Sequence, residues 1–282
     1  MIYLIISVFL FSINNILWSY FSKDNPAILL IARRAIFTSL LFTIIILIFK
    51  SNFQEITSSI VKEILLICFF GFLGLTFLIR GFSLGNLFQY SMYSLLIPIV
   101  FAFLKPSEER SIELWIPLLI TTVGFSYFVW KQFKESLPKT TSNRANTYFF
   151  LAHLFFGIAM YLQFEYFLIE NRSSVVVAAF QEVFILIIAS LIVFFNKKSI
   201  AKKVRQPLKI KHYFIMALPI SLAIIIGLEG LRLTAPFDAS LIGLYTPMTT
   251  VLLGSFLGID KIDFQSFIGV VIMTFGVLLI YF

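Results

Sequence analysis

The chain has 282 residues, of which 60% are hydrophobic and only 13% are charged, and its formal net charge is +8. A soluble domain carries roughly 25% charged residues, so this composition is typical of a membrane protein. The basic residues cluster between apolar runs, as they do in membrane proteins with a defined orientation, which argues against a nucleic-acid partner.

Ten apolar segments long enough to cross a membrane follow one another along the chain. They cover 2–21, 27–49, 62–84, 87–104, 112–130, 147–169, 174–195, 213–235, 238–257 and 265–282. The first begins directly after Met1, with no basic n-region, and is expected to be a membrane helix rather than a cleaved signal peptide. The sequence therefore predicts an all-α integral membrane protein with ten transmembrane helices.

The two halves of the chain resemble each other when residues 149 positions apart are compared. This offset pairs Pro98 with Pro247, Gly81 with Gly230, Arg33 with Glu182, and Arg80 with Glu229. Five helices per copy is an odd number, so the second copy must enter the membrane from the opposite side. We therefore predict two inverted five-helix repeats, at 1–130 and 147–282, joined by a polar linker at 131–146.

Two stretches resemble a known family. The first, 80–110, has a run of small residues followed by Pro98, and the second, 234–261, repeats this pattern around Pro247. Together with the ten-helix architecture, they resemble the EamA-type family of the drug/metabolite transporter superfamily. The resemblance implies export or exchange of small organic solutes, amino acids among them, and cytoplasmic termini. Counting Lys and Arg in the loops favours the opposite orientation. We expect a multi-pass protein of the bacterial inner (plasma) membrane.

Ionisable residues inside the apolar segments are the first candidates for a site, because charge in the hydrocarbon is costly. Arg33 and Glu182 are expected near the membrane midplane, as a substrate or proton site between the halves. The alternative is an ion pair that only holds the helices together. Arg34 points about 100° away from Arg33 on a helix. We expect Arg34 to be structural, because Arg33 has a charged repeat partner.

The other candidates are weighed against ordinary packing roles. Arg80 lies near a helix end, where snorkelling to the interface is the alternative. Glu229 stands between Gly227 and Gly230, which suggests a broken or closely packed helix. The remaining candidate substrate-binding residues are Asn14, Trp18, Tyr93, Tyr161, Glu165 and Tyr245. Residues assigned instead to packing or to the membrane interface are Asn15, Tyr90, His153 and Gln163.

No enzyme motif is present: the sequence has no metal-ligand spacing, no phosphate-binding loop and no nucleophile beside a base, so we expect no cofactor and no metal. The leading hypothesis is a secondary transporter, an exporter or exchanger of a small organic metabolite such as an amino acid or other zwitterion. Its partners would be that small-molecule substrate, the lipid bilayer and, as a candidate coupling ion, protons. Two alternatives remain: a proton-coupled exporter of cationic drug-like compounds, using Glu165, Glu182 and Glu229, and a channel or scaffold without a transport cycle.

Overall fold

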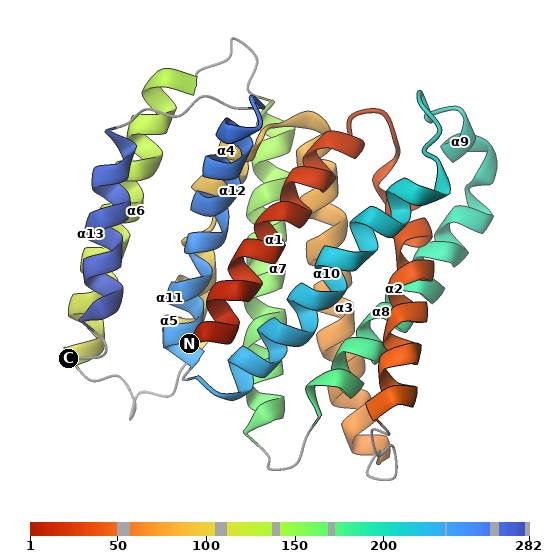
Figure 1. The fold of residues 1–282 in the computed structure, drawn as a ribbon, viewed down its shortest axis with the longest axis horizontal. Helices are drawn as coiled ribbons and strands as arrows, with labels where there is room; N and C mark the ends of the chain where they lie inside the picture. Colours follow the sequence, from red (N-terminus) through yellow and green to blue (C-terminus); the bar gives the residue numbers. More distant parts are fainter. Residues whose placement is uncertain are drawn as a thin grey trace.

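The computed structural model describes residues 1–49, 57–104, 112–136, 142–168, 173–234, 236–259 and 265–279. All regular secondary structure in these ranges is α-helical (Figure 1). The helices are α1 (Ile2–Phe21), α2 (Ala27–Phe49), α3 (Ser58–Leu84), α4 (Leu87–Met92), α5 (Leu96–Leu104), α6 (Ile112–Ser136), α7 (Asn143–Phe167), α8 (Ser174–Phe195), α9 (Lys197–Ala201), α10 (Ile210–Arg232), α11 (Pro236–Gly243), α12 (Tyr245–Phe256) and α13 (Ser266–Leu278).

Seven stretches of helix in the described chain are long and apolar enough to cross a membrane. They are α1, α2, α3, α7, α8, α10, and the stretch Asp238–Phe256 that contains most of α11 and all of α12. Two further expected segments are represented by the shorter apolar helices Leu87–Val100 and Phe267–Leu278, and a third by α6. The protein is therefore a multi-pass integral membrane protein.

Two of the segments expected to be single helices are each broken in the middle. Residues 87–104 form α4 and α5, and residues 238–257 fall in α11 and α12. Pro98 and Pro247 are the third residues of α5 and α12, and each lacks the N–H that would bond to the carbonyl four residues earlier. Each break therefore lies one helical turn before a proline.

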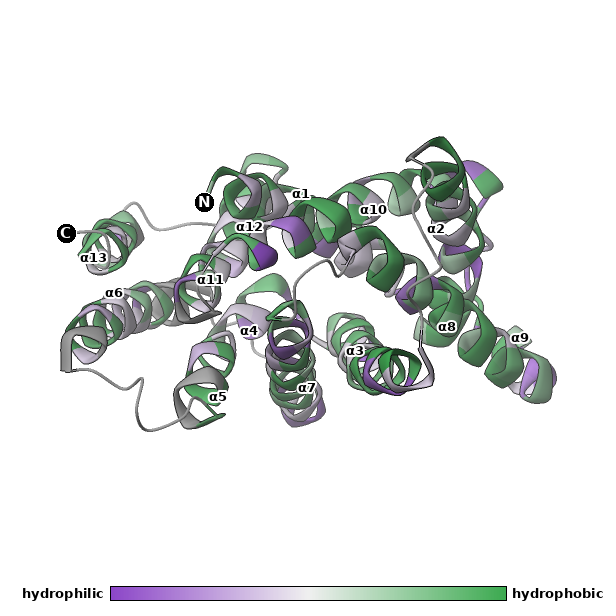
Figure 2. Ribbon diagram, turned by 90° about the horizontal axis from the view of Figure 1, so that it is seen from below, coloured by the Kyte–Doolittle hydropathy of each residue, from purple (hydrophilic) through white to green (hydrophobic). Residues whose placement is uncertain are grey.

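The helices pack in pairs that join the first half of the chain to the second. α1 packs on α10, α3 on α7, α2 on α8, and α6 on α13. The last pair stands at one end of the molecule and α9 at the other, in both views (Figures 1 and 2). Gly124 and Gly269 allow α6 and α13 to approach closely, because a Cβ on either would lie within 2.7 Å of the other's carbonyl oxygen.

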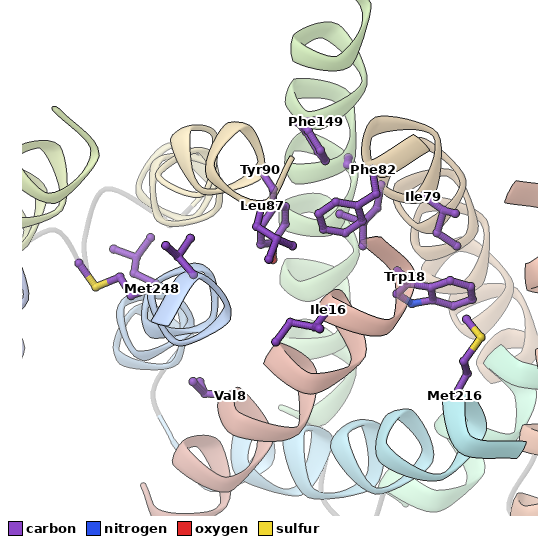
Figure 3. Close-up of a cluster of buried hydrophobic side chains, with 14 of the residues drawn as sticks. Val8, Ile16, Trp18, Ile79, Phe82, Leu87, Tyr90, Phe149, Met216 and Met248 are labelled. Carbon is purple, nitrogen blue, oxygen red and sulfur yellow. The ribbon is translucent and has the colours of Figure 1, made fainter. Parts of the chain in front are cut away.

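An aromatic cluster joins α3, α4 and α7 beside the centre of the bundle (Figure 3). The ring centroid of Tyr90 lies 5.3 Å from that of Phe82 and 5.9 Å from that of Phe149. Such edge and tilted contacts are favourable for aromatic rings. Gly81 makes room for this cluster, because a Cβ there would lie 2.6 Å from the Phe149 ring. The cluster fixes Tyr90 at the edge of the cavity described next.

Candidate functional site

A cavity of about 310 Å³ lies between helices contributed by both halves of the chain. Its walls come from α1, α2, α3, α7, α8 and α10 and from the two broken helices. Most of the lining is apolar, with Leu75, Phe156 and Ile220 as examples. A volume of this size and a lining with a few polar groups suit a small organic ligand. The polar lining residues are Ser7, Asn14, Asn15, Arg34, Tyr90, Ser94, His153, Gln163, Gln181, Glu182, Ser240 and Thr246.

A buried ion pair connects α2 to α8 at this cavity. The Nη1 atom of Arg34 donates to Oε1 of Glu182 at 3.2 Å, and Nη2 lies 3.0 Å from Oε2. The hydroxyl of Thr38 also donates to Oε2. Both charged side chains are only 1% exposed. Among the described residues that line the cavity, they are the only formally charged ones, and their two charges cancel.

The Arg34 guanidinium keeps unused hydrogen-bonding capacity. Its carbon Cζ lies 5.7 Å from the centroid of the Trp18 ring, a cation–π contact. Its Nε atom has no hydrogen-bond partner among the described residues, and Nη2 touches the carboxylate outside hydrogen-bond geometry. Asn14 Oδ1 and Trp18 Nε1 also lack partners in the described part of the chain. A buried polar atom without a hydrogen-bond partner costs free energy. A ligand or water molecule that bonds to such an atom removes this cost, so these atoms are the most favourable contact points for a bound molecule.

A second, uncharged polar group lies where α1, α4 and α7 meet. Asn15 Nδ2 donates to the Tyr90 hydroxyl at 3.1 Å, and the Tyr90 and His153 ring centroids are 4.8 Å apart. The Nδ1 atom of His153 lies 2.8 Å from the Phe149 carbonyl oxygen and must carry a hydrogen, because a carbonyl only accepts. Its Nε2 atom lies 3.0 Å from Ser94 Oγ, at the α4–α5 break.

Of the residues expected at the site, Asn14 and Glu182 line the cavity, and Trp18 is fully buried against Arg34. Arg33 does not meet Glu182. It is exposed on the other side of α2, where Nη1 donates to the Tyr213 hydroxyl at 3.1 Å. The structure thus places the two arginines opposite to expectation: Arg34 lines the cavity and Arg33 packs on Tyr213 of α10.

The other expected residues lie away from the cavity, near helix ends or in contacts between helices. Glu229 pairs with Arg232 on α10 and accepts from Ser174 Oγ at 3.0 Å. Arg80 and Glu165 are exposed in the last turns of α3 and α7. The remaining three make helix contacts: Tyr93 packs edge-on against Phe150, Tyr161 donates to the Leu104 carbonyl oxygen, and Tyr245 donates to Thr274 Oγ1.

The sequence contained an indication that Arg34 faces the interior, which comparison of charged residues between the two repeats did not reveal. Arg34 and Thr38 are four residues apart and share one face of α2. The residues that share a face with Arg33 are Ile36, Phe37 and Leu40, all apolar. On α7, His153 and Gln163 fall on one stripe with Phe156 and Met160, and all four line the cavity. No group of three His, Cys, Asp or Glu able to hold a metal occurs among the described residues.

A multi-pass helical protein with a central cavity of substrate size has the architecture of a membrane transporter. Residues 143–282 match the sequence model of the EamA-like transporter family. This stretch of the chain is therefore similar to an EamA-like transporter domain. The matched family is one of transporters.

A solved crystal structure has the same fold as this chain. It superposes with a TM-score of 0.67 at 15% sequence identity, over 97% of this chain and 96% of its own. At this identity, the similarity speaks for the fold alone. Comparison with curated protein sequences finds no match.

Proposed function

We propose that this protein is a secondary transporter that exports or exchanges a small organic metabolite by alternating access at the central cavity. The observation that carries this proposal is the buried Arg34–Glu182 pair in a cavity shared by the two halves. Buried ion pairs inside a membrane bundle are costly to build and commonly mark a substrate or ion pathway.

The alternating-access part rests on a second proposal, that residues 1–130 and 147–282 are inverted five-helix repeats joined at 131–146. The offset of 149 residues relates α1 to α7, α2 to α8, and α3 to α10. A two-fold axis then requires that the α1–α10 contact be matched by an α7–α3 contact, and it maps a contact between α2 and its counterpart α8 onto itself. Both pairs of contacts are present, and the two broken helices also correspond. In this arrangement the Arg34–Glu182 pair joins two counterpart helices that meet on the axis, as α6 and α13 also do.

We propose that the substrate has no net charge, as an amino acid or other zwitterion does. Opening the Arg34–Glu182 pair leaves two buried charges unpaired unless a ligand satisfies both. The carboxylate of a zwitterion would replace Glu182 on the Arg34 fork, and its ammonium group would bind Glu182 and the free oxygen of Asn14. A simple cation would satisfy Glu182 alone and leave Arg34 as a repulsive neighbour.

The alternative of a proton-coupled exporter of cationic compounds has less support. This hypothesis requires three carboxylates at the site, Glu165, Glu182 and Glu229. Of these three, only Glu182 lines the cavity. A protonated Glu182 would also leave Arg34 without its counter-ion. Saturable uptake distinguishes both transporter hypotheses from a channel or a scaffold without a transport cycle.

Counterflow in proteoliposomes tests the proposal. Vesicles loaded with an unlabelled amino acid are given traces of labelled neutral, acidic and basic amino acids and of a quaternary ammonium compound. We expect saturable uptake of a net-neutral zwitterion that is stimulated by the internal substrate. Uptake restricted to the cation would favour the drug exporter. Non-saturable flux far above about 10³ molecules per second would identify a channel.

A further inference from the structure

A strongly basic surface lies away from the cavity, on residues 196–212 between α8 and α10, here termed the basic segment. It carries no Asp or Glu, and its Lys and Arg side chains are all exposed: Lys197, Lys198, Lys202, Lys203, Arg205, Lys209 and Lys211. Within the described ranges, none of these side chains forms an ion pair with a carboxylate. The described carboxylates therefore leave the positive charge of this surface unpaired.

The basic segment is held in a defined conformation. Ile200 is buried in α9, and the backbone N–H of Arg205 donates to the Asp24 carbonyl oxygen at 2.9 Å. The N–H of Lys209 donates to His212 Nδ1 at 3.1 Å and starts α10. These contacts use backbone atoms, the Ile200 side chain and the His212 ring, so the Lys and Arg side-chain cations remain available to a partner.

The apolar neighbours of the segment indicate the kind of partner. Phe194, Phe195 and Ile210 stand at its two ends and are 74%, 78% and 74% exposed. α9 lies at the lateral edge of the bundle, beyond α8, in both views (Figures 1 and 2). The lateral neighbour of a membrane protein is lipid. Exposed apolar side chains next to basic groups match the boundary between acyl chains and headgroups.

We propose that the basic segment binds the phosphate-bearing headgroups of anionic phospholipids in the leaflet that borders it. Phe194, Phe195 and Ile210 contact the acyl chains, and the Lys and Arg side chains contact the phosphates. Each basic residue close to an anionic surface strengthens binding roughly five-fold. This site is separate from the central cavity and does not depend on the proposed transport activity.

The test uses the purified full-length chain in neutral detergent, with phosphatidylglycerol or phosphatidylcholine added at equal concentration. Melting temperature and the number of bound lipids by native mass spectrometry are measured. We expect phosphatidylglycerol to raise the melting temperature more than phosphatidylcholine. Lys202→Gln/Lys203→Gln should weaken the apparent affinity for phosphatidylglycerol on the order of 25-fold, while Lys202→Arg/Lys203→Arg should keep it. Raising salt from about 0.1 M to about 1 M should reduce the difference between the lipids.

The matched control removes two exposed bases elsewhere, by Lys62→Gln/Arg144→Gln. This variant should bind phosphatidylglycerol as the wild type does. Equal losses in the two Gln variants would mean a general effect of net charge and would overturn the assignment to this segment. Stabilisation by soluble glycerol phosphate equal to that by the lipid would identify a soluble anion site instead. Unchanged lipid binding in Lys202→Gln/Lys203→Gln would refute the proposal, whether or not the protein transports.

Discussion

Charge-neutral replacement of Arg34 and Glu182, singly and together, examines the centre of the proposed site. Arg34→Gln leaves a carboxylate that is 1% exposed with only the Thr38 hydroxyl as a donor. Glu182→Gln leaves a guanidinium with the Trp18 ring as its remaining partner. Removing one member of a buried ion pair costs about 3–5 kcal/mol, because the other charge stays buried.

The double replacement should cost far less than the sum of the single ones. With no charge left in the cavity wall, the two amides can hydrogen-bond to each other, and we expect a loss of about 1 kcal/mol. The coupling free energy of the cycle would then be about 5–9 kcal/mol, above the range of about 0.5–3 kcal/mol that is common for residues in contact. The melting temperature of each single variant in detergent should fall by roughly 6–15 °C, and that of the double variant by a few degrees.

Arg33→Gln is the matched control, since it makes the same substitution one residue away on α2. Arg33 is exposed and bonds to Tyr213, so its replacement should cost about 0.5 kcal/mol and leave flux nearly unchanged. A loss of stability as large as that of Arg34→Gln would contradict the structural assignment of the two arginines.

Flux separates a binding role from a purely structural one. If Arg34 and Glu182 bind the two charges of a zwitterion, the double variant should recover stability but not counterflow. If it recovers both, the pair only holds α2 against α8, and the zwitterion site is wrong.

Three further predictions concern single positions. Asn14→Leu should leave stability nearly unchanged, because Asn14 Oδ1 has no described hydrogen-bond partner to lose, but it should weaken substrate binding roughly ten-fold. Asn15→Leu should lower the melting temperature, because Asn15 donates to the Tyr90 hydroxyl. Similar melting curves for the two variants would count against this division of roles. Gly124→Ala should destabilise the protein by about 1–3 kcal/mol where α6 meets α13, and Gly243→Ala, with no atom within 4 Å of the added Cβ, by less than about 1 kcal/mol. The family resemblance implies that a cysteine replacing Lys203 is labelled from outside the cell; protection would place this face in the cytoplasm, as the loop charges favour.

Hydropathy was enough to predict the helices, because each segment must satisfy its backbone within itself and present apolar side chains to lipid. The breaks at 93–95 and at Leu244 were not predicted, although both prolines were visible. A proline in a membrane helix can be accommodated by a kink, and only the packing of neighbouring helices decides that the helix ends.

The site was harder to predict, since the environment of a polar residue depends on which face of its helix meets the bundle. Tyr90 and His153 fall near the starts of the expected segments 87–104 and 147–169, where anchoring at the interface is the common role of aromatic residues. Here the close packing of α3 on α7 at Gly81 draws both into the interior, where Ser94 and Asn15 bond to them. This packing of α3 on α7 brings together residues more than fifty positions apart in the sequence. The hydrophobic periodicity of a single segment contains no information about such a contact.

The position of the ion pair has a mechanistic consequence if the halves are inverted repeats. α2 and α8 would exchange places under the two-fold operation, so their contact would lie on the axis about which the halves rock. A charge pair there sits at equal depth from both faces and can face either side without moving far. Opening the pair with an empty cavity would expose two unpaired charges to low dielectric, whereas opening it around a zwitterion would not. The empty carrier would then cross between its two states slowly and the loaded carrier quickly, which is the kinetic signature of an exchanger.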